Sequence, residues 1–211
     1  ARLRQAIKQM RVVSLSELEL LVKPKSDGGG REPGITDLLV SIAKEQCQFF
    51  HNADLEPYAT FERNNHRECW HLQSKGFSEW LSYQLYQTEG YAPSDVMLKS
   101  AIASLSGQAK FEGDEKPVHV RTARHDDAYW LDLCNDHWQA VRITADGWQV
   151  IDNPPVMFTR SSSSRPLPIP RQGGDFAALW DFVNIPEADR LTVLAWMLEC
   201  LRPDTPYLVL E

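Results

Sequence analysis

Residues 117–160 constrain the fold most, because apolar and polar residues alternate there instead of recurring at helical spacing. Turn-forming residues interrupt the alternation at His125-Asp126-Asp127, Asn135-Asp136, Asp146-Gly147 and Asn153-Pro154-Pro155. Short extended segments joined by tight turns pair with their neighbours in antiparallel fashion. The stretch therefore predicts a five-strand antiparallel meander, through VHVRTAR, AYWLDLC, HWQAVRIT, WQVID and VMFTR.

Helical spacing dominates the sequence that precedes the meander. Apolar residues recur every three to four positions over residues 35–47, which predicts an amphipathic helix. Residues 74–90 and 93–107 predict a helical hairpin. The residues expected to begin or end its helices are Ser94, Gly90 and Gly107. A small sheet is predicted over residues 47–72, through CQFFH, PYATFER and RECWHLQ.

Composition divides the chain into four parts, and the expected fold class is α+β. Residues 1–33 form a basic N-terminal segment that ends in a glycine-rich linker, and residues 34–160 hold the helices and the meander. A Ser/Pro linker follows at 161–174. Residues 175–211 predict two helices, 175–183 and 187–201, that lead into a truncated nucleotide-binding domain through the apolar strand Tyr207–Leu210.

Charge and cysteine usage narrow the possible functions. The chain has 211 residues and a formal net charge of −7, which argues against a protein that coats nucleic acid over its whole surface. The four cysteines lie far apart with no CxxC pair, as expected for reduced thiols in a cytoplasmic protein. No stretch approaches the ~20 uncharged apolar residues that a membrane span needs.

Basic and aromatic residues alternate in ATFERNNHRECWHLQSKGF, residues 59–77. Single-stranded nucleic acid is bound by cations that contact phosphates beside aromatic faces that stack on bases. The stretch is therefore a candidate nucleic-acid site, and the alternative is a solvated hairpin loop with a buried tryptophan. The candidate binding residues, two of them from the meander, are Arg63, His66, Arg67, Trp70, Lys75, Arg121 and Arg124.

Other patterns leave alternatives open. The sequence HxxCxH, from His66 to His71, has the residue types of a metal site, with His51 upstream. An edge strand is the favoured explanation, because a strand directs Cys69 and His71 to one face and His66 elsewhere. The hairpin 74–107 has the layout of a helix-turn-helix but offers few side chains that read bases. A metal-dependent nuclease would need converging carboxylates, for which the candidates are Asp126, Asp127 and Asp136. No motif for a serine nucleophile or a phosphate-binding loop is present.

Residues 58–211 resemble the region before the ATPase core in bacterial prophage and mobile-element ATP-binding proteins of the primase-helicase-like type. The matching stretches are HRECWHLQSKGFSEWL, KFEGDEKPVHVRTARHDDAYWLDL, WQAVRITADGWQVIDNPPVMFTR with RPLPIP, and LTVLAWMLECLRPDTPYLVLE. In such proteins the strand that matches Tyr207–Leu210 leads into a phosphate-binding loop and Mg²⁺-coordinating residues.

The resemblance implies a non-catalytic accessory region beside a helicase-like motor, acting on DNA in the replication of a mobile element. It implies no cofactor for this chain, with ATP and Mg²⁺ belonging to the parent protein. Expected partners are single-stranded or forked DNA, the parent's own ATPase domain and further copies of the chain, with no membrane. The alternative hypotheses are a protein-interaction or oligomerisation module and, third, the metal-dependent nuclease.

Overall fold

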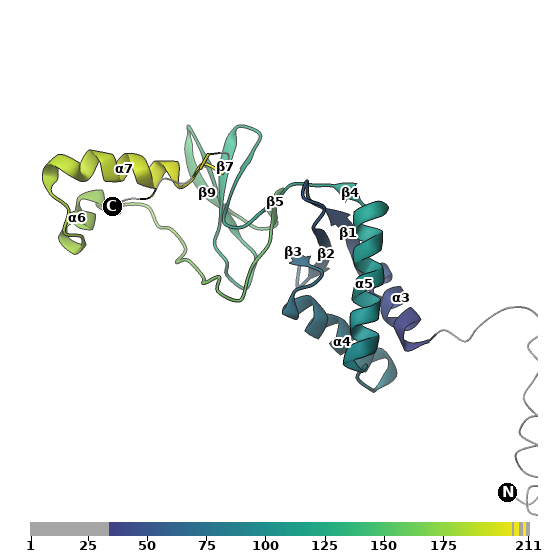
Figure 1. Cartoon of the computed structure of the whole chain (residues 1–211). Coiled ribbons are helices and arrows are strands. Elements are labelled where there is room, and N and C mark those ends of the chain that lie inside the picture. Colours follow the sequence, from purple (N-terminus) through teal and green to yellow (C-terminus); the bar gives the residue numbers. More distant parts are fainter. Residues whose placement is uncertain (1–33, 204, 207–208, 210–211) are drawn as a thin grey trace, which may run out of the picture. The chain divides into compact units, whose positions relative to one another are not determined.

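The computed structural model describes residues 34–203, 205–206 and 209. The described residues from Ile35 onward belong to one compact unit of mixed helices and sheets, which confirms the α+β class (Figure 1). The predicted segment and linker at 1–33 lie outside the described residues. So does the predicted strand Tyr207–Leu210, apart from Val209.

The first sheet has four strands in the order β3-β2-β1-β4. Strands β1 (Gln48–His51), β2 (Pro57–Arg63) and β3 (His66–His71) pair in antiparallel fashion, which confirms the predicted small sheet. Strand β4 (Asp114–Glu115) adds to the other side of β1 in parallel, and the sequence did not predict it. The chain thus returns to this sheet after both long helices.

Three helices cover one face of the first sheet (Figure 1). They are α3 (Ile35–Gln46), α4 (Lys75–Glu89) and α5 (Asp95–Phe111). The Ser94 hydroxyl accepts from the backbone N–H of Met97, and Gly90 ends α4 at φ 78°, so both predicted boundaries are confirmed. Gly107 does not end α5, because it adopts helical geometry and the helix continues for a further turn.

The main core lies between these helices and the sheet. The fully buried side chains Leu39, Phe77, Leu81 and Leu105 come from all three helices. Ala59 and Phe61 meet them from β2, because alternate residues of a strand face the same side of a sheet. Burial of each large apolar side chain contributes roughly 1.5–3 kcal/mol, so this layer fixes the sheet on which the candidate site is built.

The second sheet is an antiparallel meander in the order β6-β7-β8-β9. Its strands are β6 (Thr122–His125), β7 (Ala128–Asp132), β8 (Ala140–Thr144) and β9 (Gly147–Ile151). The fifth predicted strand does not extend this ladder. Instead, β10 (Met157–Phe158) pairs in parallel with β5 (Val118–His119). Pro154 and Pro155 precede β10 and have no N–H to donate, so the ladder cannot run on through them.

The C-terminal segment is helical, as predicted. It comprises the 3₁₀ turns η1 (Phe176–Ala178) and η2 (Glu187–Asp189) and the helices α6 (Leu179–Phe182) and α7 (Arg190–Glu199). The apolar side chains of α7 are largely exposed, and Val193 is the buried residue of this helix. None of the helices in the described part of the chain has both the length and the apolar character that a membrane crossing requires.

Candidate nucleic-acid interface

A buried carboxylate, Glu68, lies at the centre of the predicted binding stretch. The β2–β3 register puts Arg63 opposite His66, and alternation along β3 places His66, Glu68 and Trp70 on one face. Oε1 of Glu68 lies 3.3 Å from Nε of Arg63 and 3.2 Å from Nε2 of His66. The Trp70 indole N–H donates to Oε2 at 2.8 Å. Three of the seven predicted residues therefore hold Glu68, which is only 3% exposed.

The Trp70 ring has a second structural contact. It lies against Gly76 on the first turn of α4, where an added Cβ would fall 1.4 Å from Cζ3 of Trp70. Only a glycine gives the ring this space. The indole is thus packed on a helix and bonded to Glu68, and it is half-buried. A base could reach only part of its face.

Arg63 and Arg67 line a hollow of about 590 Å³ at the end of β2, called here the cationic hollow. Lys116, which follows β4, supplies a third cation. The lining also includes three amides, Gln46, Gln48 and Gln84. Glu62 is the one carboxylate among the described lining residues. The hollow therefore has a surplus of positive charge and many hydrogen-bonding groups, in a chain that is acidic as a whole.

The strand register explains why this space exists. β1 begins at Gln48, which pairs with Thr60, so β2 continues beyond β1 through Phe61–Arg63. No strand in the described part of the chain lies beside β2 on that side there. Gln46 ends α3 beside the opening, and its Nε2 donates to Oε1 of Gln84 on α4 at 3.3 Å. Two helices and a strand end thus frame the hollow.

The three cations differ in how far they are already paired. The Arg63 side chain is 56% exposed while it contacts Glu68. Lys116 lies 4.0 Å from Asp114 and 5.6 Å from the centre of the Phe50 ring. The backbone N–H of Arg67 donates to Asn153, but no described residue pairs with its guanidinium. Arg67 is therefore the cation most available to an incoming anion.

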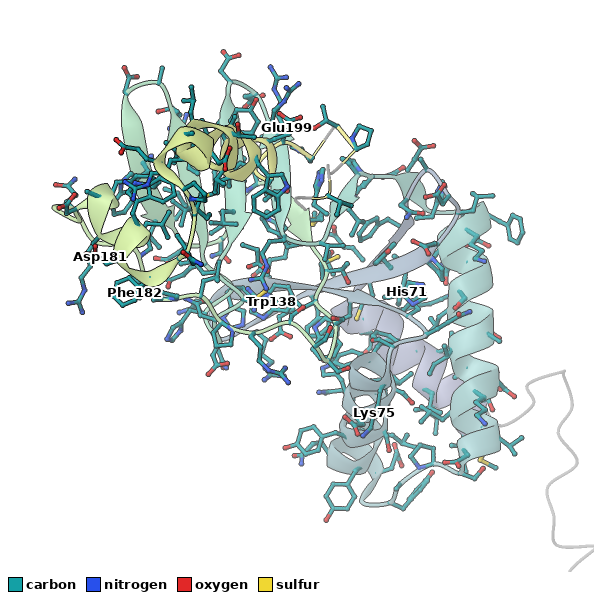
Figure 2. All side chains as sticks on the ribbon, turned by 60° about the vertical axis from the view of Figure 1, so that its left-hand side comes forward. His71, Lys75, Trp138, Asp181, Phe182 and Glu199 are labelled. Carbon is teal, nitrogen blue, oxygen red and sulfur yellow. The ribbon has the colours of Figure 1, made fainter. Side chains whose placement is uncertain are left out.

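The other predicted cations lie elsewhere. Lys75, on the first turn of α4, is 89% exposed and pairs with Glu79 at 3.4 Å (Figure 2). The Arg121 guanidinium donates to the carbonyl oxygens of Asp132 and Arg165, both at 3.3 Å. The Arg124 guanidinium lies 5.9 Å from the centre of the Tyr129 ring. None of the three lines the cationic hollow.

A second hollow, of about 330 Å³, adjoins the turn between β2 and β3. Its described lining residues are Asn64, Asn65, His66, His137, Gln139 and Asp152. Asn64 and Asn65 both have positive φ, as the central residues of a tight hairpin turn require. Neither lysine nor arginine is among these described lining residues. Its chemistry is therefore that of amides, imidazoles and one carboxylate.

The candidate nuclease carboxylates do not converge. Asp126 and Asp127 form the β6–β7 turn, and Asp136 is exposed in the loop after β7. Cys69 and His71 face the side of β3 opposite to His66. The side chains of HxxCxH therefore lie on both faces of the sheet and do not converge. Among the described residues, no three His, Cys, Asp or Glu side chains are grouped as a metal site needs.

Asp132, the last residue of β7, is bound by Arg160 through both carboxylate oxygens, at 2.6 and 2.9 Å. It is 1% exposed. Its carboxylate also accepts from the backbone N–H and the thiol of Cys134, both at 3.0 Å. The Arg160 guanidinium lies 3.9 Å from the Trp138 ring centre, a cation–π contact. Asp132 thus closes the loop between β7 and β8.

Three of the four cysteines, Cys47, Cys69 and Cys134, are poor nucleophiles. All four are free thiols. Burial raises the pKa of Cys47 and Cys69 to about 12. Burial and then the hydrogen bond to Asp132 raise the pKa of Cys134 to about 11. Because the thiolate is the reactive form, these three side chains act as core residues at neutral pH.

Comparison of the chain with protein-family models, with curated proteins and with solved structures finds no match. The two hollows and the exposed surfaces are therefore the features of the chain that bear on its function.

Proposed function

We propose that the chain binds single-stranded nucleic acid through the cationic hollow, as a non-catalytic accessory region of a DNA-replication or helicase-type ATPase of a mobile element. The observation that carries the binding is the position of Arg67. Its guanidinium has no partner among the described residues and lines a hollow with Arg63 and Lys116. The replication setting rests on the resemblance of residues 58–211.

The chemistry of the hollow favours phosphate contacts over base stacking. Phe61 and Trp80 stack on each other with ring centres 4.7 Å apart, and both are nearly buried. Their stacked ring faces are thus occupied by each other and are not open to a base. Arginine and lysine beside glutamine amides suit a sugar–phosphate backbone, which both kinds of group contact in known complexes. We expect binding at this hollow to depend strongly on salt and weakly on sequence.

The test compares two substitutions that each remove one positive charge. Binding of a fluorescent oligothymidine of about 15 nucleotides is measured by anisotropy at salt concentrations between about 50 and 200 mM. Arg67→Gln should weaken binding at least about fivefold at low salt and lower the salt slope by about 0.7, the value for one phosphate contact on a single strand. Lys75→Gln, on exposed α4, is the matched control and should change neither.

Two outcomes contradict the proposal. One is the absence of binding by the unmodified chain at low salt. The other is an equal loss of affinity in Arg67→Gln and Lys75→Gln, which would indicate attraction by overall charge instead of a site.

A second candidate function, a protein-interaction module, is favoured by the surface of the C-terminal segment. Phe182, Leu191 and Leu198 are 87, 77 and 68% exposed (Figure 2 labels Phe182). Large apolar side chains that gather on one exposed segment are typical of interaction sites.

If the segment mediates self-association, light scattering after gel filtration should give a mass that rises with protein concentration. The double variant Leu191→Glu with Leu198→Glu should then be a monomer at every concentration. A monomer at every concentration of the unmodified chain would exclude self-association.

A further inference from the structure

The second hollow has the chemistry to bind a nucleobase. Its asparagine and glutamine amides offer paired donors and acceptors, and Asp152 offers acceptors alone. Base edges are recognised by such amides and carboxylates. A phosphate would find neither lysine nor arginine among the described lining residues. The volume of about 330 Å³ lies at the small end of ligand pockets, which begin at ~300 Å³.

The position of this hollow relates it to the cationic hollow. Asn64, Asn65 and His66 form the tip of the β2–β3 hairpin and line the second hollow, whereas Arg63 and Arg67 flank that tip and line the first. The hairpin pairs Arg63 with His66 directly. A strand whose phosphate contacts Arg67 would thus have a base within reach of the second hollow.

Hydrogen bonds hold the polar groups of the second hollow in place. Gln139 accepts from Nδ2 of Asn135 at 2.8 Å and donates from Nε2 to Oδ1 of Asp152 at 2.7 Å. The amide of Gln139 is therefore oriented by its neighbours. Oδ2 of Asp152 has no partner among the described residues, so it remains an acceptor for a ligand N–H.

We propose that the second hollow takes one nucleobase that carries an exocyclic amino group, with cytosine the best fit. Asp152 accepts from the amino group, as carboxylates do from N4 of cytosine. Thymine presents a carbonyl oxygen at the equivalent position, which a carboxylate repels. This inference rests on the proposed function, because the base is delivered by a strand bound at the cationic hollow.

The experiment compares oligocytidine with oligothymidine of equal length, using the anisotropy measurement on the full chain. The unmodified chain should bind oligocytidine at least about threefold more tightly, since a good base contact discriminates by a factor of this order or more. Asp152→Asn should reduce that ratio toward one and leave oligothymidine affinity unchanged or higher. Asp146→Asn, which removes the same charge at the other end of β9, is the control and should keep the preference.

Failure of this inference and failure of the proposed function give different results. Equal affinity for the two oligonucleotides, with Arg67→Gln still weakening both, overturns the base pocket and leaves the cationic hollow standing. A preference that persists in Asp152→Asn also overturns it. If neither oligonucleotide binds, the proposed function fails, and a titration with cytidine and thymidine followed by amide NMR decides the pocket. Shifts at Asn64 and Gln139 with cytidine alone support it, and equal or absent shifts overturn it.

Discussion

Replacing Asp132 by alanine should lower the free energy of unfolding by about 3–5 kcal/mol, the cost of breaking a buried ion pair from one side. The substitution leaves the Arg160 guanidinium, 13% exposed, without its bidentate partner. It also removes the acceptor for the buried backbone N–H of Cys134. Urea unfolding with linear extrapolation measures the change.

The matched control for Asp132 is Asp136→Ala, four residues along the same loop. Asp136 is exposed, so its loss should change stability by no more than about 0.5 kcal/mol. Equal effects of the two substitutions would show that Asp132 contributes through the loop's local conformation and not through Arg160.

Replacing Glu68 by alanine has the second largest expected effect, a loss of about 2–3 kcal/mol. His66 is buried and the Trp70 N–H points at Glu68, so both donors would lose their acceptor where little water can replace it. The lost contact with Arg63 contributes less to this change in the free energy of unfolding, because the Arg63 side chain is 56% exposed and therefore largely solvated.

Two further variants separate the roles of Glu68. Glu62→Ala, an exposed carboxylate on the neighbouring strand, should leave the unfolding free energy nearly unchanged. Glu68→Gln keeps the shape of the side chain and one acceptor oxygen. Its loss in the free energy of unfolding should therefore fall between those of Glu68→Ala and Glu62→Ala. If Glu68→Ala were as stable as Glu62→Ala, the carboxylate would not hold the hairpin together.

Most of the local structure could be predicted from the sequence, because its signals are local. Ser94 and Gly90 mark helix ends through their own conformational preferences, and alternating residues marked the strands. The errors arose where a local signal was ambiguous. Gly107 tolerates helical geometry on an open surface, and β10 has the composition of a ladder strand although it pairs with β5.

The candidate site was less predictable, because it depends on residues that only the register brings together. Arg63 and Arg67 could be selected from their sequence context. Lys116 is distant in the sequence and reaches the hollow through β4, a two-residue strand without a sequence signal. The sequence did not predict that Glu68 would contact Arg63, His66 and Trp70. An isolated glutamate on a strand is usually solvated.

The side chain of Asn153 acts as one peptide group at the outer edge of β3. Its amide oxygen accepts from the N–H of Arg67 at 2.9 Å, and its amide nitrogen donates to the carbonyl oxygen of Asn65 at 2.7 Å. Further along the same edge, Thr159 bridges to Cys69. An uncovered edge strand is a template on which a second chain can add and start aggregation. Asn153, a single turn residue, occupies the N–H of Arg67 and the carbonyl oxygen of Asn65 on this edge. A second chain therefore cannot pair with β3 at these groups, and no charge is added beside the carboxylate of Glu68.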